Sequence, residues 1–176
     1  MDELIAEMDR RYKLFAEESV EDLFEYNRGH KRSMLPVLWL FHDEIADWTR
    51  DKDYNREFTA KMTILATKVR AAGIFLVPIA QRPDKDVLPM QVRDNLGNRL
   101  ALKLETEASS KIALDKSGAE LLLGKGHLAA RIGSSITYAQ CAFLDSAQAE
   151  QAAKAITADY DEITINCQNS FPSWRM

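Results

Sequence analysis

Apolar residues recur at helical spacing through the first 28 positions of the chain. They stand three or four positions apart, which predicts an amphipathic helix from residue 2. Ser19 is predicted to be the N-cap of a second helix, because the acidic Asp22 follows it three positions later. Further helices are predicted over roughly residues 55–72, 117–123 and 147–158.

Apolar runs predict four strands between these helices. Residues 37–41 (VLWLF) are apolar without alternation, which is typical of a strand covered on both faces. Residues 74–80 (IFLVPIA) predict a second buried strand, although Pro78 fits an interior strand poorly. Residues 99–104 and 136–143 predict two more strands. This order of helices and strands is typical of an α/β layer fold with a largely parallel sheet.

Composition excludes several classes of protein. The 176 residues are 46% hydrophobic, which is too apolar for a disordered chain and enough for one domain with its own core. The formal net charge of -4 excludes a globally basic nucleic-acid binder, but it does not exclude a local basic patch. The two cysteines share no metal-ligand spacing, so the default setting is a reducing cytoplasm without a zinc site.

Two carboxylates, Asp43 and Glu44, directly follow the first predicted strand. In α/β sheets, ligands bind outside the carboxyl ends of strands, where one acid can hold Mg²⁺ and a second can polarise water. The alternative is an ordinary acidic pair that caps the next helix. Gln81 and Arg82 follow the second strand and are expected at the same sheet edge, where a Gln can hold a water. The alternative there is a polar turn ended by Pro83.

Together, the two strand ends favour nucleotide hydrolysis, but a phosphate-binding loop is missing from this sequence. No GxxxxGK[ST] string occurs in the 176 residues. The glycine-rich segment 118–126 (GAELLLGKG) has the wrong spacing and no hydroxyl after its lysine.

Several linked segments point to one family. They are MDRRYKL (8–14), LFHDEIAD (40–47), AQRP (80–83), NRLA (98–101), SSKIALD (109–115) and GAELLLGKG (118–126). In this order, they resemble the motor domain of the FtsK/SpoIIIE family of hexameric, RecA-like DNA-translocating ATPases, with LFHDEIAD similar to its Walker B strand. The resemblance implies a RecA-like α/β fold over residues 1–158, with a largely parallel sheet flanked by helices and without the P-loop strand. Residues 159–176 would be a tail.

The resemblance also implies site roles and cofactors. Asp43 would hold the Mg²⁺ of a bound ATP, Glu44 would activate the attacking water, and Gln81 would be the sensor residue. Arg99 falls on a basic position of the family near the subunit boundary and would reach a neighbouring subunit's phosphate. His42 replaces the family's usual aliphatic residue and is expected to be structural.

Basic residues of the loops are the implied DNA contacts. Arg82, Lys85 and Arg93 would face the central DNA channel, where contacts with the backbone need charge rather than base recognition. The alternative for each is a solvated surface cation. Lys111 stands where the family commonly has Arg, so a phosphate-binding role is not assigned to it.

The function implied by the resemblance is part of an ATP-driven motor that moves double-stranded DNA, as in chromosome segregation or conjugative transfer. The intact protein would be a cytoplasmic hexameric ring, with any membrane tether encoded upstream. This chain alone is expected to hydrolyse little or no ATP, and the missing strand predicts an exposed sheet face or edge. One alternative is a non-catalytic RecA-like module that binds partners or serves in a protein-secretion ATPase. Another is an unrelated α/β hydrolase or binding domain.

Overall fold

The computed structural model of the chain describes residues 1–49, 51–82 and 90–167. The chain divides into two units, Met1–Ala139 and Gln140–Met176. The first unit contains both sheets, and the second contains one long helix.

The first unit begins with α1 (Asp2–Glu18) and α2 (Leu23–Gly29), which confirms the two predicted helices. Ser19 ends α1 in a left-handed conformation, with φ of 55°. The N-cap of α2 is Asp22, whose carboxylate accepts the Glu25 N–H at 2.8 Å. The prediction that Ser19 is the N-cap is therefore wrong. Two residues of this segment, Ser19 and Asp22, could each cap a helix. Because Ser19 takes part in the left-handed turn that ends α1, only Asp22 is free to cap α2.

A parallel pair of strands, β1 (Leu38–His42) and β2 (Ile74–Pro78), forms the first sheet. The chain passes between them through α3 (Ile45–Trp48) and α4 (Lys52–Lys68). Parallel strands joined by helices confirm the predicted α/β class. The proline fits because it is the last residue of β2, where the ladder ends.

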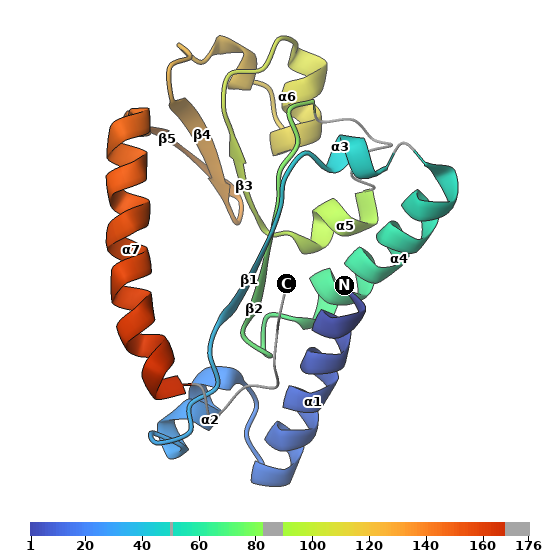
Figure 1. Cartoon of the computed structure of the whole chain (residues 1–176). Helices are drawn as coiled ribbons and strands as arrows, with labels where there is room; N and C mark the ends of the chain where they lie inside the picture. Colours follow the sequence, from blue (N-terminus) through green and yellow to red (C-terminus); the bar gives the residue numbers. More distant parts are fainter. Residues whose placement is uncertain (50, 83–89, 168–176) are drawn as a thin grey trace. The chain divides into compact units, whose positions relative to one another are not determined.

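Helices α1 and α4 cover one face of this pair (Figure 1). Met8 of α1, Leu65 of α4 and Ile74 of β2 are buried in the same cluster. Phe58 and Met62 of α4 are also buried, as the helical spacing of residues 55–72 predicts.

The other face of the pair is apolar and exposed. Trp39 is 58% exposed and Phe41 65%. The Trp39 ring stacks on Phe75 with 4.7 Å between ring centroids. The prediction that β1 is covered on both faces is wrong for the first unit, in which α1 and α4 pack on one face of the strand pair. The expected exposed sheet face is present.

The second sheet contains β3 (Asn98–Ala101), β4 (His127–Ile132) and β5 (Ser135–Gln140) in that order. β3 and β4 pair antiparallel. α6 (Glu107–Leu114) and the short 3₁₀ helix η1 (Ala119–Leu121) precede β4. Side chains from this region form a separate buried cluster, which contains Ala101, Leu114, Ala119, Leu122 and Ala129. The sequence pattern predicted neither β4 nor α6, and it placed all strands in one largely parallel arrangement.

Two further helices complete the described chain. α5 (Met90–Asn95) precedes β3 in the first unit. α7 (Ser146–Cys167) forms the second unit and continues past residue 158, where the sequence predicted the tail to begin. Within the described ranges, no helix is both long and apolar enough to cross a membrane.

Gly73 offers a test of the packing between α2 and the first sheet. Its φ is +71°, and a Cβ built on it would overlap the Leu23 side chain. Gly73→Ala should lower the free energy of unfolding by about 2–4 kcal/mol, since the left-handed backbone and the overpacking both cost energy. Urea denaturation of the two proteins measures this difference.

Gly29→Ala is the matched control, because nothing lies within 4 Å of the added Cβ. Its free energy of unfolding should stay equal or rise by up to about 1 kcal/mol, since Gly29 is in a helix. Equal losses in both variants would show that the Gly73 turn is not constrained in this way.

Candidate functional site

The parallel register of the first sheet brings the ends of its two strands together. His42 lies opposite Pro78. Beyond that pair, the Ile79 N–H donates to the His42 carbonyl at 2.9 Å, and the Ile45 N–H donates to the Ile79 carbonyl at 3.0 Å. The segments that leave the two strands are therefore still hydrogen-bonded to each other after the ladder ends.

The predicted site residues follow directly from these strand ends. Asp43 and Glu44 come after β1, and Gln81 and Arg82 come shortly after β2. Because the strands are parallel and in register, all four leave the sheet at one edge, as the sequence predicts. Glu44 is half-buried, and the other three are exposed. The edge is thus open to a ligand.

Glu44 has an unusual backbone conformation. Its φ of 44° and ψ of 67° are left-handed, which costs a residue with a side chain roughly 1–2 kcal/mol. Although Glu44 is the N-cap residue of α3, its side chain makes no capping hydrogen bond. The Glu44 N–H donates to Asp43 Oδ1 at 3.1 Å. A strained carboxylate that does not cap its helix is typical of a functional position.

His42 is packed inside the fold, as expected for a structural residue. Its ring centroid lies 5.1 Å from that of Phe58 on α4. Burial lowers the pKa of His42 more than a backbone hydrogen bond and the nearby Asp43 charge raise it.

Arg99 belongs to the second sheet rather than to the strand ends. Its Nη1 lies 2.8 Å from Asp115 Oδ2, and its Nη2 donates to the Arg93 carbonyl at 3.0 Å. The Arg99 side chain is only 11% exposed. Arg93 donates from its Nη1 to the Ile112 carbonyl at 2.8 Å, so it is not a simple solvated cation.

The remaining basic candidates differ in their surroundings. Arg82 is exposed after β2. Lys85 lies outside the described residues. Lys111 pairs with Glu107 at 2.7 Å on the surface of α6.

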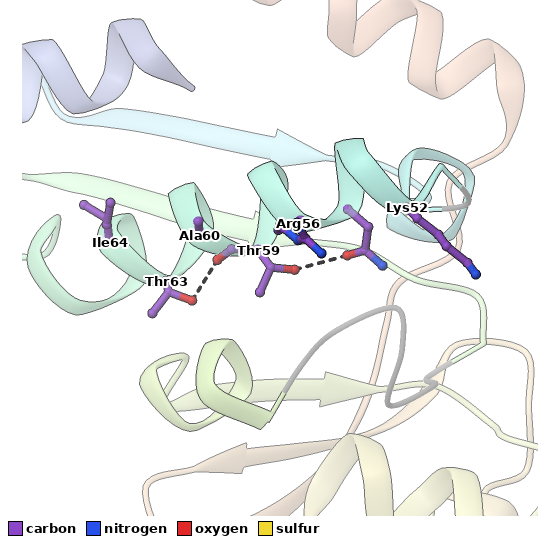
Figure 2. Close-up of a pocket in the computed structure, with 7 residues that line it drawn as sticks. Lys52, Arg56, Thr59, Ala60, Thr63 and Ile64 are labelled. Carbon is purple, nitrogen blue, oxygen red and sulfur yellow. Dashed lines mark hydrogen bonds between the residues drawn. The ribbon is translucent and has the colours of Figure 1, made fainter.

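A groove of about 660 Å³ runs along α4, which the sequence reasoning did not single out (Figure 2). The described residues that line it all belong to this helix and are Lys52, Asn55, Arg56, Thr59, Ala60, Thr63 and Ile64. Thr59 donates to Asn55 Oδ1 at 3.1 Å, and Thr63 donates to the Thr59 carbonyl at 2.7 Å. None of the strand-end candidates is among these lining residues.

Comparison with known proteins decides the family. The chain is 36% identical over 124 residues to a DNA translocase FtsK of Caldanaerobacter subterraneus, a match that covers 70% of this chain. It is 35% identical over 161 residues to the DNA translocase FtsK of Listeria monocytogenes, covering 85% of this chain. The DNA translocase SftA of Bacillus subtilis is 35% identical over 132 residues. The chain belongs to the FtsK/SpoIIIE family.

Solved structures share the fold of this chain. The TcpA conjugation coupling protein of pCW3 superposes with a TM-score of 0.76 at 25% identity, over 84% of this chain and 44% of that one. The cytoplasmic domain of the Thermomonospora curvata type VII secretion ATPase EccC gives a TM-score of 0.69 at 18% identity, over 81% of this chain and 17% of that one. No protein-family model matches the chain.

This FtsK/SpoIIIE family chain is much shorter than its curated relatives. It spans 17% of the Caldanaerobacter protein, 21% of the Listeria protein and 13% of the Bacillus protein. The family and the RecA-like fold are therefore established for this chain.

The backbone strain at Glu44 can be measured through its effect on the free energy of unfolding. Glu44→Gly should raise the free energy of unfolding by about 0.5–1 kcal/mol, because relief of the left-handed penalty exceeds the entropy cost of a glycine. Ala46→Gly, two residues later in helical backbone, should lower it by about 1 kcal/mol. Urea denaturation measures both variants, and a Glu44→Gly loss as large as the Ala46→Gly loss would argue against strain.

Proposed function

We propose that the chain is part of an ATP-driven motor that moves double-stranded DNA. The observation that carries this proposal is the shared edge of β1 and β2. It presents two adjacent carboxylates and a glutamine, where α/β folds bind their ligands. The strained backbone of Glu44 supports a role in catalysis rather than in helix capping.

The end of β1 suits a Mg²⁺ ion that is held mainly by the phosphates of a bound ATP. In the described parts of the chain, no three His, Cys, Asp or Glu side chains gather into a metal-binding cluster. Mg²⁺ commonly takes one or two carboxylates together with phosphate oxygens and water. Asp43, exposed at the tip of β1, fits that donor set as the protein ligand. When bound with ATP, Mg²⁺ neutralises charge on the phosphates.

The remaining roles follow from chemistry at the same edge. Glu44 accepts the proton of the attacking water, and Gln81 orients that water. Arg99 stabilises charge on a phosphate of the neighbouring subunit in a hexameric ring. This sequence has no GxxxxGK[ST] loop, so the chain alone does not turn over ATP.

Basic residues contact the DNA backbone in this proposal. Arg82 is exposed at the strand-end edge, and Lys85 follows it in the sequence. Arg93 is the weakest of the three, because its guanidinium already donates to the Ile112 carbonyl. The complete protein works in the cytoplasm, in chromosome segregation or conjugative transfer.

The second candidate is a RecA-like module of a protein-secretion ATPase. EccC and the EssC protein of Geobacillus thermodenitrificans share the fold at 18% and 13% identity, a level that indicates the fold alone. The curated relatives named DNA translocase are 35–36% identical. The higher identity favours DNA as the cargo.

A chimaera tests the catalytic assignment. Residues 1–158 would replace the matching segment of the Listeria monocytogenes relative, and ATP hydrolysis would be measured with duplex DNA present. Glu44→Gln should lower kcat by roughly 10²–10⁴-fold, because the general base is lost, while ATP binding is retained.

Glu57→Gln is the control, since Glu57 is an α4 carboxylate that pairs with Lys61 away from the strand ends. This variant should hydrolyse ATP at the parent rate. A Glu44→Gln chimaera that hydrolyses ATP within twofold of its parent would remove Glu44 from catalysis.

A further inference from the structure

Two arginines face each other across the second sheet. Arg99 on β3 and Arg131 on β4 are directly opposite in the antiparallel register. Like charges at such positions repel each other and destabilise the pair. The fold therefore needs a negative group between them.

Asp115 provides that group. It follows α6 in a left-handed conformation, with φ of 57°. Its Oδ2 lies 2.8 Å from Arg99 Nη1 and also contacts Arg131 Nη1. Asp94 is more distant, at 3.9 Å from Arg99 Nη2. Although partial burial would raise the pKa of Asp115, the hydrogen bond from Arg99 and the charges of the three nearby arginines lower it.

Backbone carbonyls hold part of this cluster independently of Asp115. Arg99 donates to the Arg93 carbonyl at 3.0 Å, and Arg93 donates to the Ile112 carbonyl at 2.8 Å. These bonds fix Arg99 between β3 and the segment before it. Removal of the carboxylate would therefore leave the Arg99 guanidinium in place.

Among Asp115, Arg99 and Arg131, the carboxylate is the most exposed of the three. The Asp115 side chain is 47% exposed, compared with 25% for Arg131 and 11% for Arg99. Solvent thus reaches the negative group first, with the positive groups behind it. Arg99 and Arg131 share this one carboxylate at bonding distance, and the charge of Arg93 lies nearby, so a more highly charged anion would balance the arginines better.

We propose that Asp115 occupies the anion position between Arg99 and Arg131 until a phosphate group displaces it. The proposal rests on the proposed function in that it takes phosphate as the ligand of Arg99. Guanidinium groups bind phosphate oxygens in the same forked geometry as carboxylate oxygens. In the absence of phosphate, Asp115 keeps the two like charges compatible with the fold.

The test uses the complete 176-residue chain, with pyrophosphate and ATP titrated in separate arms at constant ionic strength. The ¹³Cγ signal of Asp115 and the Nε–Hε signals of Arg99 and Arg131 are followed by NMR. Pyrophosphate should change the chemical shifts of all three signals. The Asp115 ¹³Cγ signal should move toward the chemical shift of a solvated carboxylate. Shifts with both probes indicate recognition of any phosphate, and shifts with ATP alone indicate recognition of the nucleotide.

Asp115→Asn should change the pyrophosphate affinity in the opposite direction from the replacement of a purely structural residue. Without the competing carboxylate, pyrophosphate affinity should rise about fivefold. A residue that only supports the fold would lower the affinity when replaced. Glu107→Gln is the control, because this α6 carboxylate pairs with Lys111 rather than with Arg99 or Arg131. The pyrophosphate affinity of this variant should match that of the wild-type chain.

Two results would overturn the proposal. One is an Asp115 signal that does not shift at saturating pyrophosphate or ATP. This result would overturn the proposal even if added duplex DNA shifts the signal. The other is a folded Asp115→Asn chain that binds pyrophosphate no more tightly than wild type. If Asp115→Asn does not fold, the wild-type titration decides alone. Loss of ATP hydrolysis in the Glu44 test is a separate readout, so failure of the motor proposal is distinguishable from failure of this one.

Discussion

The parallel register between β1 and β2 is the constraint on which the candidate site depends. It sets His42 against Pro78 and continues through the backbone bonds of Ile79 and Ile45. A slip of one residue would turn each strand's apolar side chains to the opposite face. The buried cluster of Met8, Leu65 and Ile74 would then be broken, so the packing of α1 and α4 fixes the register. The chemistry at the edge is thus positioned by the core beneath it.

A buried charge reinforces that core. Arg11 of α1 is 1% exposed and donates to the Ala72 carbonyl at 2.8 Å and to Glu7 Oε1 at 2.7 Å. It ties α1 to the turn that leads into β2. Within the described residues of the first unit, the opposite face of the sheet has no such support, and Trp39 and Phe41 are exposed there. The edge that carries Asp43 and Glu44 is therefore supported by packing on one face of the sheet.

Much of this arrangement could be predicted from local pattern. Helical spacing identified α1 and α4, and two apolar runs identified β1 and β2, from which the common edge follows. The exposure of Trp39 could not be predicted, because an apolar run does not say what covers it. Ser19 was misassigned because capping chemistry alone does not choose between overlapping registers.

Other features depend on long-range pairing or on backbone conformation. The Arg99–Arg131 pair could not be found before β4 was known, since its register joins residues far apart in sequence. The left-handed backbone of Glu44 has no sequence signal, because glutamate is not a residue that favours positive φ. Both proposals rest on these features, and local rules are most often broken at functional sites.

The proposed role of this chain is to supply the catalytic edge of a motor that moves DNA. Displacement of a triplex-forming strand from duplex DNA by the Listeria chimaera measures that movement directly. The parent chimaera should displace the strand when ATP is present, and the Glu44→Gln chimaera should not. A folded chimaera that hydrolyses ATP through Glu44 but displaces no strand, with the unmodified Listeria protein active beside it, would contradict the claim.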